Sequence, residues 1–184
     1  MRYSAAETAE RHEQIIREAA RLFRERGFSG VSVAEIMQAA GLTHGPFYNH
    51  FPSKEDLIAK SLEHGMQSAL ARVEQVGNSP RKMAEYLNRY LSPSHRDAPG
   101  KGCTVASLAA EIRQQPEVRG KFTAHARALI EKMVTKLAWK SKRSSRGDSI
   151  RMLSTMVGAL VLSRAVDDDA FSKEILREAR RGIA

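Results

Sequence analysis

Apolar residues recur at intervals of three and four positions along most of the chain, which is the spacing of one face of an α-helix. The stretch from residue 6 to 26 is typical, with an inward stripe of Ile15, Ile16, Ala19, Ala20, Leu22 and Phe23. Glycine, proline and serine clusters separate the later helices, which we expect at 53–76, 83–90, 103–112, 116–137, 150–166 and 170–183. Runs of β-branched residues are few, so the chain is predicted to be all-α, with about nine helices in all.

Two segments are expected to be loops. Residues 92–102 contain two Pro and two Gly, the residues that most often interrupt helices. Residues 136–151 are rich in Lys and Arg and are interrupted by serines and a glycine. We interpret this second segment as a solvated loop, with a second nucleic-acid patch as the alternative. Asp148 or Ser149 would cap the helix that follows it.

Residues 32–54 combine two short helices with a turn that contains glycine. Ser32 and Glu35 have the S-x-x-E spacing of a capping box, in which each side chain binds a free backbone N–H of the new helix. This first helix is expected to close at Gly41. Thr43 then offers a cap for a second helix through residues 45–51, in which a proline of the first turn is tolerated.

The second short helix has distinct inner and outer faces. Phe47 and Phe51 are four residues apart and are predicted to face inward. The residues left to point outward are Thr43, His44, Gly45, Tyr48 and His50. Two short helices with an outward polar face predict a helix-turn-helix, whose second helix enters the DNA major groove.

The whole stretch is more specific than its parts. Residues 30–57, GVSVAEIMQAAGLTHGPFYNHFPSKEDL, resemble the DNA-binding signature of the TetR family of bacterial transcriptional regulators. The resemblance implies a helix-turn-helix domain at 1–53 and a helical effector-binding and dimerisation domain at 54–184. It also implies a homodimer with a double-stranded DNA operator as partner. Repression of transcription is the family default.

The resemblance assigns the DNA contacts position by position. Ser32, Tyr48 and His50 would contact phosphates, and Lys54 would contact the DNA backbone. The residues in the positions that meet base edges are Thr43, His44, Gly45 and Pro46. Lys is frequent in the family where His44 stands and Thr where Pro46 stands, so the resemblance does not give the base preference.

The family's place for a small-molecule effector is the carboxy-terminal bundle. Binding there would change the spacing of the two recognition helices through the fourth helix and release the DNA. Candidates to line an apolar pocket with a few polar tips are Met66, Tyr86, Tyr90, Cys103, Phe122, His125, Met133 and Trp139. The alternative for each of these residues is plain core packing.

The last two predicted helices resemble the helices that pair in the TetR dimer. Small residues at steps of three and four would let a partner helix approach closely. The candidate interface residues are Ser154, Gly158, Leu162, Ala165, Phe171, Ile175 and Ala179. A monomer that buries both helices in its own core fits the periodicity equally well.

Cys103 is the one cysteine of the chain and follows Gly102 at a predicted helix start, where backbone N–H groups favour a thiolate. The segment GCTVASLAAE resembles that of a group of TetR-like proteins in which a cysteine senses electrophiles. A redox- or electrophile-sensing repressor is therefore an alternative, and a buried small hydrophobe is the other. A thiol-dependent enzyme using Cys103 and His125 is a weaker alternative, because no catalytic motif accompanies the pair. An effector-independent DNA-binding protein is the last alternative.

The formal net charge of +9 adds little to the argument for DNA binding. Residues 1–60 hold equal numbers of basic and acidic side chains, so the excess lies in residues 61–184. A solvated basic surface explains most of it. The amino end has no apolar segment typical of a secretion signal, and a cytoplasmic regulator without metal or cofactor is expected.

Overall fold

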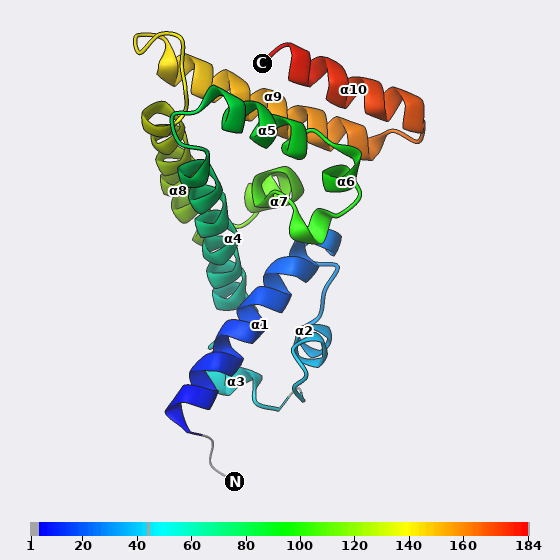
Figure 1. Cartoon of the computed structure of the whole chain (residues 1–184). Helices are drawn as coiled ribbons and strands as arrows, with labels where there is room; N and C mark the ends of the chain where they lie inside the picture. The colour runs from blue at the N-terminus through cyan, green and yellow to red at the C-terminus, as the bar shows by residue number, and fades with distance from the viewer. Residues whose placement is uncertain (1–3, 44, 184) are drawn as a thin grey trace.

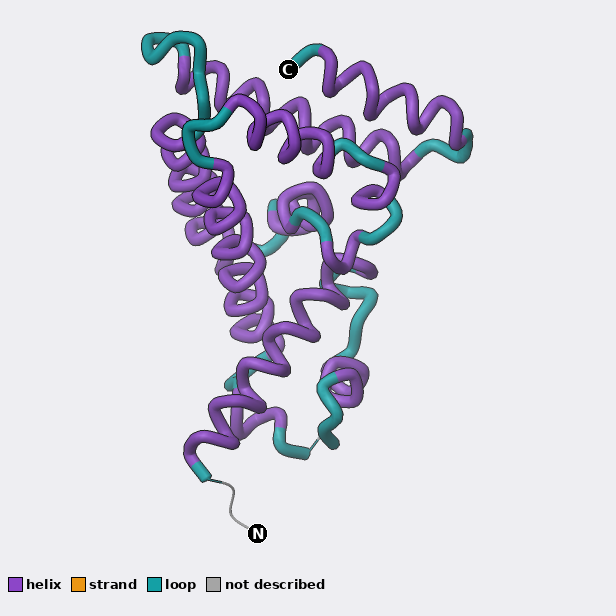
Figure 2. Tube along the Cα trace, viewed as in Figure 1, coloured by secondary structure: helices purple, strands orange, loops and turns teal. Residues whose placement is uncertain are grey.

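The computed structural model describes residues 4–43 and 45–183. All regular elements in this part of the chain are helical, which confirms the predicted all-α fold (Figure 2). The elements are α1 (Ala5–Arg26), α2 (Val33–Ala39), α3 (Phe47–His50), α4 (Lys54–Val76), α5 (Pro80–Tyr90), α6 (Pro93–Arg96), the 3-10 helix η1 (Pro99–Lys101), α7 (Thr104–Ile112), α8 (Pro116–Lys136), α9 (Ser145–Ala165) and α10 (Asp169–Arg181). None of these helices is both long and apolar enough to cross a membrane.

Serine caps set where several of the helices begin. The capping box predicted at Ser32 and Glu35 is present, and Ser4 and Glu7 form a second one at the start of α1. Ser53 accepts a hydrogen bond from a backbone N–H in the first turn of α4. Because such caps satisfy N–H groups that otherwise lack a partner, short polar side chains fix the helix starts from local sequence alone.

The helices form an elongated bundle (Figure 1). Helices α1, α2 and α3 occupy one end, and the antiparallel pair α9 and α10 crosses the opposite end. Helix α4 runs without interruption from beside α3 toward the α9 end, and α8 lies along it. Helix α7 lies between α1 and α9 in the middle of the molecule.

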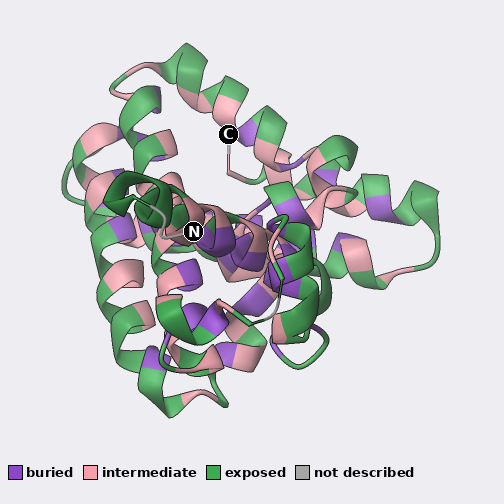
Figure 3. Ribbon diagram, turned by 90° about the horizontal axis from the view of Figure 1, so that it is seen from below, coloured by how far each residue is buried: buried purple, intermediate pink, exposed green. Residues whose placement is uncertain are grey.

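The core consists of one large cluster at the α1–α3 end and two smaller ones toward α9 and α10. The large cluster joins the inner faces of α1, α2 and α3 to the start of α4, and it continues to Leu108 and Ile112 of α7. Seen from the α1–α3 end, buried residues lie along the inner faces of the helices and exposed residues along the outer faces (Figure 3). The helix-turn-helix end is therefore packed directly on α7.

The segment 92–102, predicted as a loop, contains α6 and η1 instead. Pro93 and Pro99 each stand at the start of a short helix, where a missing N–H costs nothing. Ser92 caps α6 by accepting a hydrogen bond from His95 N. The prediction was wrong because it treated both prolines as helix breakers.

Helix α9 begins at Ser145, five residues before the predicted start, and neither Asp148 nor Ser149 is its cap. Ser145 and Ser149 are four residues apart and both are buried, so this first turn packs inward despite its polar composition. The Ser145 hydroxyl donates to Lys142 O. Of the segment 136–151 that was predicted as a loop, only residues 137–144 lie between helices.

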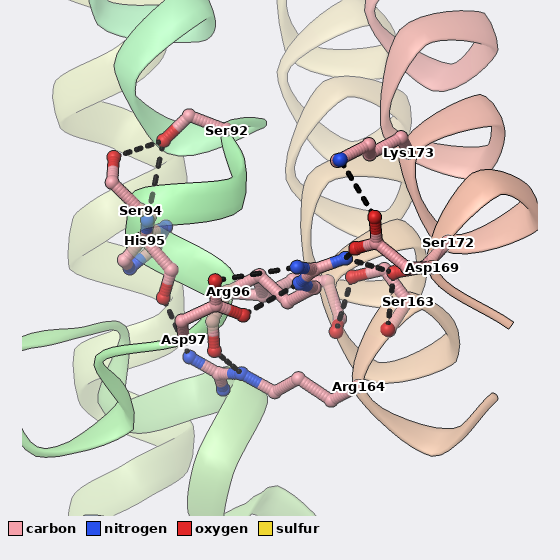
Figure 4. A network of polar contacts seen from close by, with 11 residues as sticks. Ser92, Ser94, His95, Arg96, Asp97, Ser163, Arg164, Asp169, Ser172 and Lys173 are labelled. Atoms are coloured by element: carbon pink, nitrogen blue, oxygen red, sulfur yellow. Dashed lines mark hydrogen bonds and ion pairs between the residues drawn. The ribbon is translucent and has the colours of Figure 1, made fainter. Parts of the chain in front are cut away.

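A polar network fastens α6 to the end of the molecule that carries α9 and α10 (Figure 4). The Arg96 guanidinium forms an ion pair with Asp169 at 3.0 Å and donates to Ser172 Oγ at 2.7 Å. From α9, Arg164 donates to the backbone carbonyls of Arg96 at 3.0 Å and His95 at 3.1 Å. Both arginines cross between segments about seventy residues apart in sequence, so they fix the position of α6.

Candidate nucleic-acid interface and ligand cavity

The turn between α2 and α3 is formed by backbone hydrogen bonds. Gly41 has φ +70°, the left-handed conformation predicted for the end of the first short helix. Gly41 N donates to Gln38 O and Leu42 N donates to Met37 O, both at 2.9 Å. This close return of the chain sets the angle at which the next segment leaves α2.

Helix α3 is shorter than the sequence predicted. It begins at Phe47, its cap position is Pro46, and no side chain caps it, so the capping role expected of Thr43 is wrong. Residues 45 and 46 form a turn and are not part of the helix, because Gly45 would lose conformational entropy in a helix. The recognition element is therefore an extended turn followed by one helical turn.

The inner face of α3 is aromatic, as predicted. Phe47 and Phe51 are buried, with ring centroids 5.6 Å apart, and His12 of α1 stacks on Phe51 at 4.5 Å. This packing turns Tyr48 outward, where 69% of its surface is exposed. Of the other predicted outward residues, Thr43 and Gly45 are exposed as well.

Pro46 and His50 are only half-exposed, and His44 lies outside the described residues. The His50 ring lies 5.9 Å from the ring of His12. Burial is the first cause that lowers the pKa of His50, followed by the charges of His12 and Arg11. His50 is therefore a neutral hydrogen-bonding group at pH 7.

Ser32 is already engaged at the N-terminus of α2. Its hydroxyl donates to Glu35 Oε2 at 2.7 Å and accepts from Glu35 N at 3.2 Å. Arg26 donates to the same carboxylate at 2.6 Å. The bonds from Ser32, and then the one from Arg26, lower the pKa of Glu35 to about 2. A phosphate bound by Ser32 would have to share this helix terminus with the Glu35 carboxylate.

Backbone carbonyls of the protein hold the Lys54 ammonium, whereas the predicted role of Lys54 was a contact with the DNA backbone. Its ammonium donates to Phe28 O at 2.7 Å and to Val31 O at 2.6 Å, which fixes the start of α4 to the connection between α1 and α2. A lysine ammonium has three donors, so one remains for a DNA phosphate.

A cavity of about 410 Å³ lies between α4, α5, α7 and α8, with the segment 94–101 as a further wall. Five of the eight predicted effector residues line it, and these are Met66, Tyr86, Tyr90, Cys103 and His125. They come from α4, α5, α8 and the N-cap position of α7, so the structure brings together residues that are distant in sequence.

The three other predicted effector residues lie elsewhere. Phe122 packs against the large core cluster, and Met133 is buried in the cluster near α9. Trp139 borders a second, apolar cavity of about 680 Å³ between α5 and α9, and its Nε1 donates to Met133 O at 2.8 Å. Helical periodicity identified Phe122 and Met133 as inward-facing but could not tell core from cavity wall, and Trp139 lies beyond the predicted helix 116–137.

Three polar atoms on the wall of the 410 Å³ cavity are buried without a hydrogen-bond partner among the described residues. They are the Tyr90 hydroxyl, Thr104 Oγ1 and His125 Nε2. Burial, and next the neighbouring Cys103, raise the pKa of Tyr90 well above its ordinary value. Burial raises the pKa of Tyr86 to about 12. Both tyrosines are therefore neutral donors at physiological pH.

Comparison with known proteins agrees with this arrangement. Residues 15–60 match the family model described as bacterial regulatory proteins, tetR family. A solved TetR-family transcriptional regulator from Agrobacterium tumefaciens is 25% identical and matches with a TM-score of 0.78, covering 96% of this chain and 99% of its own. The chain belongs to the TetR family.

Curated relatives of this TetR-family chain are regulators as well. The HTH-type transcriptional regulator UidR of Escherichia coli (strain K12) is 24% identical over 166 residues, which cover 90% of this chain and 84% of UidR. The HTH-type transcriptional repressor DhaR of Mycobacterium sp. (strain GP1) is 27% identical over 109 residues, covering 58% of this chain and 54% of DhaR. This TetR-family chain is accordingly a transcriptional regulator with a DNA-binding helix-turn-helix.

The TetR-family chain also presents an apolar face on α9 and α10. Leu162 is 57% exposed and Phe171 is 50% exposed, and Ser154 and Ala165 are exposed beside them. The other predicted interface residues, Gly158, Ile175 and Ala179, are half-buried. Exposed apolar side chains that gather on one face mark an interaction surface, whereas single ones do not.

Sequence reasoning missed the cationic side chains of the cavity wall, of which Arg72, Arg89 and Lys101 are the main ones. Basic residues on helices are usually solvated, so these three were not among the predicted cavity residues. A signal was present, because Arg72 lies three residues after Ala69 and Arg89 three residues after Tyr86, on the faces that line the cavity.

Proposed function

We propose that this TetR-family regulator represses transcription by binding a near-palindromic operator as a homodimer, and that a small molecule in the 410 Å³ cavity releases it. The observation that carries the DNA-binding role is the outward face of α3. Phe47 and Phe51 hold the helix to the core, while Tyr48 and Thr43 remain exposed. Side chains so placed can reach phosphates and base edges in a major groove. The name of DhaR supports repression.

The proposed DNA-binding domain is residues 1–53, and the proposed effector-binding and dimerisation domain is residues 54–184. The start of α4 at Lys54 supports this division. Ser32, Tyr48 and His50 are the proposed phosphate contacts, together with the third N–H of Lys54. The proposed base-contacting residues are Thr43, His44, Gly45 and Pro46.

The proposed dimer interface is the apolar face of α9 and α10. Pairing with a second copy would cover Leu162 and Phe171, which one chain leaves half-exposed. A two-fold axis at this face and parallel to the long axis of the chain would place both α3 helices at the same end of the dimer, because α3 lies at the end of the chain away from α9 (Figure 1). The half-sites would then lie one or more helical turns of DNA apart.

The cavity supports the effector role because it combines apolar walls with unpartnered polar atoms. It is bordered by Met66 of α4, the helix that begins at the helix-turn-helix. An effector that binds one arrangement of α4 better than another would shift the dimer away from the DNA-binding state.

Selection of bound DNA from a random duplex pool tests the proposal, followed by binding of the recovered site to the wild type and to Tyr48→Ala. Tyr48 is exposed, so its removal should not disturb the fold. Gln38→Ala, at another exposed position of the helix-turn-helix, is a control for substitution near the site. A palindromic site that Tyr48→Ala fails to bind supports the proposal. Absence of any enriched site with folded wild-type protein would contradict it.

Electrophile sensing by Cys103 is a second candidate, supported by the position of this thiol on the cavity wall. Alkylation by iodoacetamide should then weaken operator binding by the wild type and leave Cys103→Ser unaffected. Equal binding by alkylated and untreated wild type, with alkylation verified by mass, would count against it.

A further inference from the structure

The wall of the 410 Å³ cavity carries several positive groups and no carboxylate. Its titratable basic side chains are Arg72, Arg89, Lys101, His95 and His125. Among the described residues that line the cavity, none is Asp or Glu. The chain as a whole has 21 acidic residues, so this one-sided composition is a local property of the cavity.

The positive groups of the wall lack counter-ions. Arg72, Arg89 and Lys101 form no ion pair within the described part of the chain, whereas Lys132 on the adjacent α8 pairs with Glu74 at 2.7 Å. Salt bridges are otherwise frequent on this protein's helices, as between Arg21 and Glu18 at 2.9 Å. Three cations that line one cavity without an ion-pair partner make its potential positive, and a positive potential favours an anion.

Two half-buried arginines near the wall, Arg24 and Arg164, add to the positive potential. Arg24 donates to Gly100 O, and Arg164 donates to backbone carbonyls of the segment 95–96. Burial is the first cause that lowers the pKa of both side chains, and for Arg24 the next cause is the charge of Arg72. Carbonyl partners satisfy the N–H groups but leave the positive charge uncompensated.

The carboxylates nearest to these arginines are engaged elsewhere. Glu25, which acts on Arg24, pairs with Arg21 at 2.9 Å. Asp97, which acts on Arg164, pairs with Arg96 at 2.7 Å. The positive potential of the cavity is therefore not cancelled by a neighbouring ion pair.

The rest of the wall fits an organic molecule rather than a bare ion. Met66, Leu129 and Leu153 form an apolar side of the cavity. The Tyr90 hydroxyl, Thr104 Oγ1 and His125 Nε2 are buried there without partners and offer hydrogen bonds to a polar substituent. Thr104 is 5% exposed, so bulk solvent has little access to its hydroxyl and a group bound in the cavity would supply a partner. The volume lies within the range of about 300–1,000 Å³ that small-molecule sites occupy.

We propose that the cavity binds an organic acid, with its carboxylate held by Arg72 and Arg89 and its apolar body against Met66, Leu129 and Leu153. Bidentate arginine recognition suits a carboxylate, and the apolar wall selects acids with a hydrocarbon body over inorganic anions. The identity of this acid as the effector rests on the function proposed above, but its binding does not.

Calorimetric titration of the purified protein with benzoate, naphthoate and decanoate, each beside its neutral primary amide, tests the proposal. At least one acid should bind about tenfold or more tightly than its amide, as expected for a hydrogen bond to a charged group. Arg72→Gln should abolish this difference. Arg127→Gln, which removes an exposed arginine of α8 outside the cavity wall, should leave it unchanged.

Arg89→Gln is the second variant, because Arg72 is half-buried and its replacement could perturb the fold. Arg89 is exposed, so its replacement should weaken acid binding in a protein with an unchanged circular dichroism spectrum. The proposal is overturned if no acid binds at millimolar concentration, if acids and amides bind equally, or if both cavity variants behave like Arg127→Gln.

Operator binding measured in the same samples separates this proposal from the effector function. Acid binding that leaves operator affinity unchanged would support the anion site and refute its role as effector site. Release of DNA by an amide as readily as by its acid would support the effector role and refute the preference for an anion.

Discussion

Replacement of Gly27 by alanine should disturb the contact between the helix-turn-helix end and α7. Gly27 ends α1 with φ +76° and ψ 172°, a conformation that is essentially restricted to glycine. A Cβ added there would overlap Glu111 Oε1 and lie 3.0 Å from Glu111 Cδ. The Glu111 carboxylate accepts a hydrogen bond from Phe28 N at 2.7 Å, so its displacement also breaks this link between α7 and the α1–α2 connection.

The cost has two parts that a matched variant can separate. Gly77 ends α4 with φ 59° and ψ −164°, close to the conformation of Gly27, and a Cβ added there meets nothing within 4 Å. Gly77→Ala should therefore cost only the backbone strain, about 1–3 kcal/mol. Gly27→Ala should cost this strain and, in addition, a hydrogen bond to a charged acceptor, about 1.5–3 kcal/mol.

Urea unfolding of both variants at one protein concentration measures this difference, because unfolding of a dimer depends on concentration. In a Glu111→Ala background, Gly27→Ala should fall to the cost of Gly77→Ala, since the carboxylate to be displaced is gone. Equal destabilisation by the two glycine substitutions in the wild-type background would refute the reasoning. So would an undiminished cost of Gly27→Ala without the Glu111 carboxylate.

Three further predictions concern the other surfaces. His50→Ala should weaken operator binding about fivefold on every sequence, while His50→Gln retains it, because the role proposed for His50 is that of a neutral donor to phosphate; a sequence-dependent loss in a binding titration would contradict this role. Gly158→Leu should lower the sedimentation mass to that of a monomer, because Gly158 lies in the proposed interface, and Gly120→Leu should not. A Cβ added at either glycine meets nothing within 4 Å in one chain, so neither substitution should disturb the fold of the monomer; a dimer with Gly158→Leu would exclude this interface. The stability advantage of the wild type over Glu35→Gln should be full above pH 4.5 and disappear as pH falls toward 2, because folding lowers the pKa of Glu35; an advantage that persists in urea titrations at pH 2 would contradict the assignment.

Local sequence determined much of the fold, and the reasons are specific. The starts of α2 and α4 follow from Ser32 and Ser53, whose hydroxyls cap the helix that comes directly after them. The inner face of α3 follows from the four-residue spacing of Phe47 and Phe51. Such signals act within one helical turn, so they can be read without knowledge of the tertiary structure.

Features that depend on long-range contacts could not be predicted in this way. Lys54 resembles a surface lysine in sequence, but carbonyls 23 and 26 residues earlier in the chain hold its ammonium. The first turn of α9 is polar, yet Ser145 and Ser149 are buried by packing that the sequence does not specify locally. Met66 and Met133 are both buried in core clusters, and the fact that Met66 also borders the cavity while Met133 does not depends on how α4 and α8 meet.

In the proposed dimer, the uninterrupted course of α4 would convert a small tilt into a change of DNA register. Met66 lies twelve residues beyond Lys54 on this helix, a distance of about 18 Å at a rise of about 1.5 Å per residue. A tilt of about five degrees about Met66 would move the Lys54 end by roughly 1.6 Å, and two such movements in the proposed dimer add to about 3 Å. This approaches the rise of about 3.4 Å between successive base pairs. A ligand that tilts α4 by this amount in both chains would thus shift the two recognition helices out of step by almost one base pair.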